Sequence, residues 1–184
     1  MNRASVLLCS AALCAALAAG CETGFLTQQG YEPPQPIAYS HALHAGEFKM
    51  NCRYCHFGAE QSRHAGVPPA QLCLGCHEQV KKDAPEVMKL AQAVKTGTPI
   101  EWTKVHRLPD FVWFSHAAHV APYTGLECQK CHGEVQNMVR VQQAQTMTMG
   151  WCLDCHRTIA AQQSGQPESP TKLKPPTDCA ACHH

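Results

Sequence analysis

Long apolar runs are scarce along this chain, and proline and glycine recur throughout it. The 184 residues include 13 prolines and 12 glycines, which interrupt helices and strands. The pattern therefore predicts sparse regular structure. One apolar run occupies residues 6–19, after a single Arg3. As a helix it would reach about 21 Å, less than the roughly 30 Å hydrocarbon core of a membrane, so residues 1–20 are expected to be an export signal.

The end of this signal resembles a bacterial lipobox in the sequence Leu17-Ala18-Ala19-Gly20-Cys21. We expect Cys21 to become the lipidated first residue, with residues 21–38 as a tether to the folded body. An uncleaved N-terminal helix is the alternative anchor. Either anchor predicts a location at the periplasmic face of the bacterial inner membrane.

One longer helix is predicted between residues 83 and 94. Asp83 and Glu86 have the spacing of an N-cap and its partner, and Gly97 would end the helix. The apolar positions that share one face are Val87, Leu90, Ala91 and Val94. We expect this helix to serve packing within a helical connector, residues 83–112.

The motif Cys-x-x-Cys-His occurs five times. Cysteines at i and i+3 share a face of a helical turn, where both can bond the vinyl groups of one porphyrin, and the next histidine can reach the iron. The motifs predict five covalently bound haem c groups, attached through Cys52 and Cys55, Cys73 and Cys76, Cys128 and Cys131, Cys152 and Cys155, and Cys179 and Cys182. The predicted proximal ligands of iron are His56, His77, His132, His156 and His183.

Zinc sites or thioredoxin-like pairs are the alternative interpretation of these cysteines. Neither requires a histidine directly after the second cysteine, so we favour haem. Aromatic residues make up only 7% of the chain, which would form a poor apolar core unless porphyrins supplied buried surface. The net charge of +1 offers no basic stripe for nucleic acid, which is not an expected partner.

An internal repeat divides the chain. The sequence aromatic-Ser-His-Ala-x-His begins at Tyr39 and again at Phe114, each time before two haem motifs. We therefore predict a first dihaem module in residues 39–82, a second in residues 113–161, and a linker with the fifth haem in residues 162–184.

The second axial position of each iron decides between electron transfer and catalysis. Residues at i and i+3 project from one helical turn, so each His-x-x-His sequence can serve two adjacent haems. The predicted distal ligands are His41, His44, His116 and His119. Because there are enough ligands for every iron, we expect the chain to conduct electrons and to have no catalytic residues.

The fifth iron has two candidate distal ligands. Met149 stands three residues before Cys152, and its thioether would raise the reduction potential of the haem. Its other interpretation is packing against a porphyrin edge. His106 is the weaker candidate, with a hydrogen bond to a propionate or to backbone as its other interpretation. We favour Met149.

Four longer segments accompany the haem motifs: residues 39–56, 65–69, 102–114 and 149–157. Together they resemble the pentahaem cytochrome subunit of bacterial alternative complex III and the wider class III multihaem cytochromes c, over about residues 37–184. The resemblance implies a multihaem cytochrome c fold, mostly coil with short α-helices packed around haems and little or no β structure. It also implies a mixture of bis-histidine and histidine–methionine ligation.

The same resemblance implies electron transfer within a membrane-bound quinol-oxidising complex, toward a cytochrome c or a terminal oxidase. The implied partners are an iron–sulfur subunit related to molybdopterin oxidoreductases, a monohaem cytochrome c and quinol-binding integral membrane subunits. Two other functions stay open, namely a free periplasmic electron shuttle or reductase donor, and a multihaem enzyme with one open iron.

Overall fold

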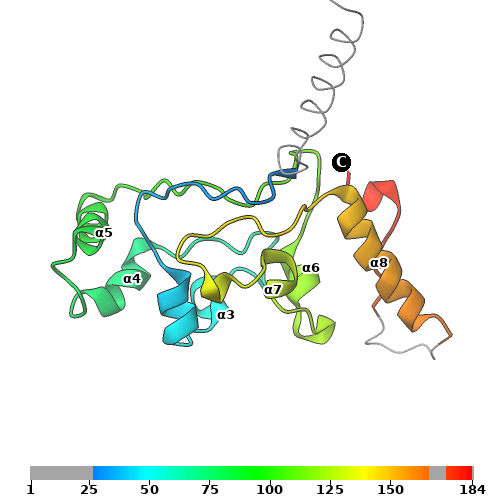
Figure 1. The fold of residues 1–184 in the computed structure, drawn as a ribbon, viewed down its shortest axis with the longest axis horizontal. Coiled ribbons are helices and arrows are strands. Elements are labelled where there is room, and N and C mark those ends of the chain that lie inside the picture. The colour runs from blue at the N-terminus through cyan, green and yellow to red at the C-terminus, as the bar shows by residue number, and fades with distance from the viewer. Residues whose placement is uncertain (1–26, 166–172, 184) are drawn as a thin grey trace, which may run out of the picture.

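Short helices joined by irregular segments are arranged in a row along the long axis of the molecule (Figure 1). The computed structural model describes residues 27–165 and 173–183. The predicted signal, Cys21 and the start of the tether lie outside these ranges. Along the row, the α-helices are α5 (Pro85–Thr96), α4 (Ala70–His77), α3 (Cys52–Cys55), α7 (Gln129–His132), α6 (His116–Val120) and α8 (Met149–Gln163).

The remaining elements are tighter or wider single turns. The π-helical turn η1 is Ala42–Glu47, and the 3₁₀ turns are η2 (Pro122–Thr124), η3 (Val135–Asn137) and η4 (Cys179–Ala181). Within the described ranges, β-type pairing consists of one bridge between Val112 and His183. The expected architecture of short helices with little or no β structure is therefore confirmed.

The predicted helix after residue 83 is present as α5. Its apolar face packs inward through Val87 and Leu90, and Gly97 ends it in the left-handed conformation with φ 67°. The predicted N-cap is wrong, because the helix begins after Ala84. Glu86 accepts a hydrogen bond from the backbone N–H of residue 38 at 2.8 Å, a tertiary contact that the local pattern does not contain.

Side chains of the polypeptide form very little core. Among the described residues, the buried apolar side chains are Pro33, Val87 and Leu90, while rings such as Phe48 and Phe111 are more than half exposed. The most deeply buried polar side chain is Gln143, at 1% exposure, and its amide donates to the carbonyl of Thr27 at 2.7 Å. No helix in the described part of the chain combines the length and apolar character needed to cross a membrane.

The two repeated blocks touch through η1 and η3. The N–H of Ala42 donates to the carbonyl of Met138 at 2.9 Å. A Cβ at Gly46 would overlap the carbonyl oxygen of Gln136, so the absence of a side chain permits this close approach. The contact brings the first haem motif of one block next to the first motif of the other.

Candidate haem centres

The five Cys-x-x-Cys-His motifs lie on single helical turns, as predicted. The first two are on α3 and α4, the third and fourth are on α7 and α8, and the fifth begins on η4, with Cys182 as the C-cap of that turn. None of the ten cysteines of these motifs is paired in a disulfide within the described ranges. Two thiols on one turn, followed by an imidazole, are the donor set that covalent haem attachment uses.

Eight histidine rings form four opposed pairs. Each pair joins one histidine of a His-x-x-His sequence to the histidine of one Cys-x-x-Cys-His motif. The ring centroids are 6.4 Å apart for His41 and His56, 6.1 Å for His44 and His77, 6.2 Å for His116 and His132, and 6.1 Å for His119 and His156.

These separations fit one iron between each pair. Two imidazoles that bind an ion from opposite sides, each through a bond of about 2 Å, place their ring centroids about 6 Å apart. In both blocks, the first histidine of the His-x-x-His sequence faces the first motif, and the second histidine faces the second motif. The eight rings could therefore hold four irons.

One aromatic ring in each block sets the position of both His-x-x-His side chains. It meets the first histidine edge-on and stacks on the second. The centroid distances are 4.8 Å for Tyr39 and His41, 4.5 Å for Tyr39 and His44, 4.9 Å for Phe114 and His116, and 4.5 Å for Phe114 and His119. Sequence analysis identified this aromatic position as part of the repeat and missed its role, although its recurrence two residues before each pair was the signal.

Backbone carbonyls hold six of the eight opposed rings. The Nδ1 atoms bond to carbonyl oxygens at 2.9 Å (His44 to Ser40), 2.6 Å (His56 to Gly66), 2.9 Å (His77 to Val80), 2.9 Å (His116 to Arg63), 2.8 Å (His119 to Ser115) and 2.5 Å (His156 to Pro176). A carbonyl oxygen only accepts, so Nδ1 carries the proton in each ring. The Nε2 lone pair is then available for a metal ion. Among the described residues, the buried Nδ1 of His41 has no such partner.

The eighth ring, His132, has a different neighbour. Its Nδ1 lies 3.3 Å from Nε2 of His106, and the two rings are nearly perpendicular at 88°. Burial lowers the pKa of His132 to about 3, and the neighbouring His106 contributes. Burial also lowers the pKa of His106 to about 4. Both rings are neutral near pH 7, so one can donate a hydrogen bond to the other.

The motifs follow one another in space in a different order from the sequence. Burial raises the pKa of five motif thiols, and for four of them a thiol of another motif contributes: Cys73 acts on Cys55, Cys52 on Cys128, Cys155 on Cys131, and Cys182 on Cys152. The spatial order is therefore second, first, third, fourth and fifth motif. In Figure 1, α4, α3, α7 and α8 succeed each other in the same order.

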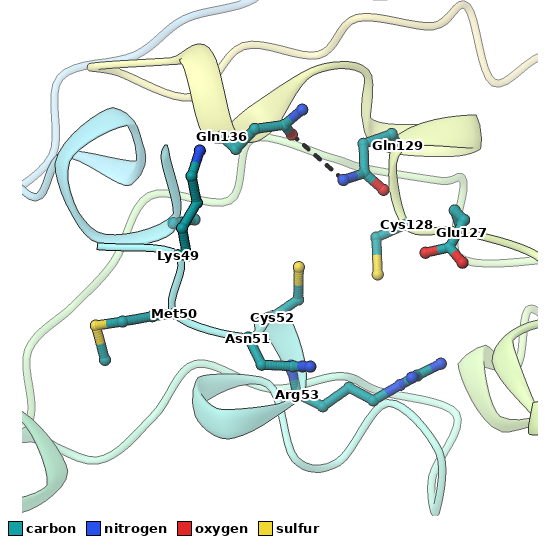
Figure 2. A pocket seen from close by; sticks show the side chains of 10 residues that line it. Lys49, Met50, Asn51, Cys52, Arg53, Glu127, Cys128, Gln129 and Gln136 are labelled. Atoms are coloured by element: carbon teal, nitrogen blue, oxygen red, sulfur yellow. Dashed lines mark hydrogen bonds between the residues drawn. The ribbon is translucent and has the colours of Figure 1, made fainter. Parts of the chain in front are cut away.

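The two blocks meet at a cavity of about 290 Å³ between α3 and α7. Figure 2 shows the sulfur atoms of Cys52 and Cys128 facing each other in this cavity, with Lys49 and Arg53 on its wall. The side chain of Gln129 donates to that of Gln136 at 3.3 Å across the top of the pocket. The attachment points of the first and third motifs are thus neighbours.

The fifth motif is fixed by backbone contacts with residues 112–113. Besides the bridge of Val112 to His183, the N–H of Trp113 donates to the carbonyl of Cys182 at 2.7 Å. The ring of Phe111 lies near that of His183, with centroids 5.7 Å apart and an angle of 28°. Among the described residues, His183 thus has a phenylalanine near it where the other four motif histidines have an opposed imidazole.

Met149 is the first residue of α8 and is 66% exposed. It precedes Cys152 by three residues on the same helical face. Burial raises the pKa of Cys152, and the nearby thiol of Cys182 raises it further. This face of α8 therefore borders the fifth motif. His106, the weaker candidate for the fifth iron, contacts His132 of the third motif.

A structural zinc site gathers four Cys, His or carboxylate ligands around one ion. Within the described ranges, no group of three or more such side chains converges in this way. The histidines are arranged as opposed pairs, a geometry that suits the two axial positions of haem iron.

Comparison with known proteins agrees with this geometry. Residues 112–184 match the family model described as cytochrome c7 and related cytochrome c. The multihaem cytochrome c subunit of menaquinone reductase from Nitratidesulfovibrio vulgaris is 33% identical over 141 residues, which cover 66% of this chain and 67% of that protein. This chain therefore belongs to the multihaem cytochromes c, a family of electron-transfer proteins that carry covalently bound haem c.

Proposed function

We propose that the chain binds five haem c groups, one at each Cys-x-x-Cys-His motif, and carries electrons along the row that these motifs form. Haem iron supplies a centre that cycles between the ferrous and ferric states. The histidine of each motif is the proximal ligand, and the four His-x-x-His side chains are distal ligands. The fifth iron takes Met149 as its distal ligand.

The observation that carries this proposal is the set of four opposed imidazole pairs with centroid separations of 6.1–6.4 Å. An iron with two histidine ligands has no open position for a substrate. The protein atoms keep the paired rings in place through backbone carbonyls and the rings of Tyr39 and Phe114. Fixed ligands allow the iron to change oxidation state with little rearrangement of its surroundings.

The proposed electron path follows the row of motifs. Its ends are the second motif on α4 and the fifth motif on η4, and the first, third and fourth motifs lie between them. The first and third motifs are the junction between the two blocks, where Cys52 and Cys128 share a cavity. An electron that enters at one end therefore crosses this junction to reach the other end.

The larger setting of this function is a membrane-bound complex that exchanges electrons with quinones. The resemblance to the pentahaem subunit of alternative complex III supports quinol oxidation, with iron–sulfur, monohaem cytochrome c and quinol-binding membrane subunits as partners. A second candidate is the opposite direction, because the relative in Nitratidesulfovibrio vulgaris is named as a subunit of menaquinone reductase. In either case we propose a periplasmic location, with a lipid on Cys21 or an N-terminal helix as the anchor.

Intact-mass analysis of the exported protein tests the cofactor content. Five covalent haem additions are expected, and fewer would contradict the proposal. The reduced protein should bind no carbon monoxide in stoichiometric amount, since every iron is six-coordinate. Uptake of carbon monoxide by the wild-type protein would instead support an enzyme with an open iron.

Purification from solubilised membranes tests the setting. We expect a tagged chain to carry quinol-binding membrane subunits and an iron–sulfur subunit with it. In that complex, reduction of the haems by added quinol would support quinol oxidation, and oxidation of the pre-reduced haems by menaquinone would support the second candidate. A chain that leaves the membrane alone would be a free electron shuttle.

A further inference from the structure

One of the eight opposed histidines has a hydrogen-bond acceptor of a different chemical kind. Six of the rings donate Nδ1–H to a backbone carbonyl, whereas Nδ1 of His132 faces Nε2 of His106 at 3.3 Å. If Nε2 of His132 binds iron, its Nδ1 carries the proton and donates it. Nε2 of His106 must then be the acceptor.

His106 is held in this position by its own segment. Gln35 makes two hydrogen bonds to the backbone of Thr103, one from the N–H of Thr103 to Oε1 and one from Nε2 to its carbonyl, both at 3.0 Å. The ring of His106 is partly buried, and its centroid lies 4.4 Å from that of His132. The contact is thus supported by a segment far from α7 in the sequence.

An imidazole nitrogen is a stronger base than a peptide carbonyl oxygen. As an acceptor it draws the Nδ1 proton more strongly, which increases the electron density at Nε2 of the donor ring. A more electron-rich axial ligand stabilises ferric relative to ferrous iron and so lowers the reduction potential.

We propose that His106 is a positioning residue for His132 and lowers the potential of the haem at the third motif below the value that a carbonyl acceptor would give. This inference rests on the proposed haem ligation by His132. The third motif is the middle of the row. By lowering the reduction potential of this haem, His106 sets the difference in potential that an electron meets when it passes from one half of the row to the other.

The test compares three holoprotein variants by redox titration with spectroscopic resolution of the individual haems. His106→Leu removes the acceptor, and His106→Gln replaces it with an amide carbonyl that resembles the other six acceptors. His64→Gln changes an exposed histidine outside the haem motifs and serves as the control. The wild-type protein must first show five haem additions and bis-histidine spectra, so a failure of the proposed ligation is detected separately.

We expect one of the five haems to shift to higher potential in His106→Leu. At a fixed applied potential, its ratio of reduced to oxidised haem should rise about tenfold, on the scale of the smallest losses of metal affinity or activity that follow removal of an outer-shell partner. His106→Gln should give a smaller shift in the same direction, with all haems still low-spin, and His64→Gln should give none.

Three outcomes would overturn the inference. Unchanged potentials in both His106 variants would mean that the acceptor has no influence, and a wild-type potential in His106→Gln would mean that its chemical kind does not matter. Conversion of one haem to a high-spin, carbon monoxide-binding form in both variants would identify His106 as a ligand of the fifth iron. His106→Gln retains a hydrogen-bond acceptor, so it keeps the test valid if His106→Leu does not fold.

Discussion

The two repeated blocks share one plan for placing histidines and differ in how the rings are held. In both, an aromatic residue stacks on the second histidine of the His-x-x-His sequence at a centroid distance of 4.5 Å. In both, the first pair of opposed rings is almost parallel, at 4° in the first block and 5° in the second. The repeat therefore preserves the contacts that are closest to the proposed iron sites.

The blocks differ in the hydrogen bonds of the first distal histidine and in the tilt of the second ring pair. Nδ1 of His116 bonds to the carbonyl of Arg63 at 2.9 Å, whereas the buried Nδ1 of His41 has no partner among the described residues. The second ring pair is tilted by 55° in the first block and by 27° in the second. The same arrangement of ligands can thus give haems with unequal properties, because the groups that contact a ligand affect the metal that the ligand binds.

Removal of the first distal histidine should have the largest effect, and it tests whether the blocks are equivalent. His41→Ala and His116→Ala should each convert one haem to a high-spin form, because each leaves one iron with an open position. Titration of the reduced protein with carbon monoxide should show about one binding site per variant. His64→Ala is the control, and an unchanged spectrum in either His41→Ala or His116→Ala would contradict the proposed pairing of its block.

Substitution of Met149 tests the centre that belongs to neither block. Met149→Leu should lower the potential of one haem, because loss of the thioether removes the ligand that favours ferrous iron. Redox titration together with electron paramagnetic resonance measures this change. If Met149 only packs against a porphyrin edge, both measurements will match the wild type.

The contact between the blocks can be weakened without touching a ligand. Gly46→Ala places a Cβ against the carbonyl oxygen of Gln136 and should reduce the free energy of unfolding by about 1–3 kcal/mol. Gly150→Ala is the matched control, since it lies outside the five motifs and a Cβ there would meet only Oγ1 of Thr148, at an ordinary contact distance of 4.0 Å. Chemical denaturation of the two holoproteins measures their free energies of unfolding. Equal values would mean that the contact between η1 and η3 does not contribute to stability.

Exchanges at the aromatic position should have the smallest effects. Phe114→Leu removes ring contacts to two histidines and should cost about 0.5–1.5 kcal/mol of stability. Tyr39→Phe gives the first block the phenylalanine that the second block has at this position, and it should change stability by less. Burial raises the pKa of the Tyr39 hydroxyl to about 12, so that side chain is neutral near pH 7 and the exchange changes no charge. Thermal unfolding of both variants checks the order of the two effects.

Much of the fold and of the site was predictable from local patterns. The helical turns of the haem motifs and the end of α5 at Gly97 depend on residues within one or two turns of each other. The N-cap of α5 was predicted wrongly because Glu86 bonds to residue 38 instead of capping its own helix. The role of Tyr39 and Phe114 was missed because stacking on a histidine leaves no trace in the sequence except the repeat itself.

The sequence by itself determined how many haem attachment motifs exist and which histidine belongs to each, because these relations span only five consecutive residues. It also indicated the two blocks, since a repeat is visible without coordinates. Only the tertiary structure decided which histidines face each other, the spatial order of the motifs, and the contact of His106 with His132. Those relations join residues that are distant along the chain, and they depend on how irregular segments pack, which no short-range pattern specifies.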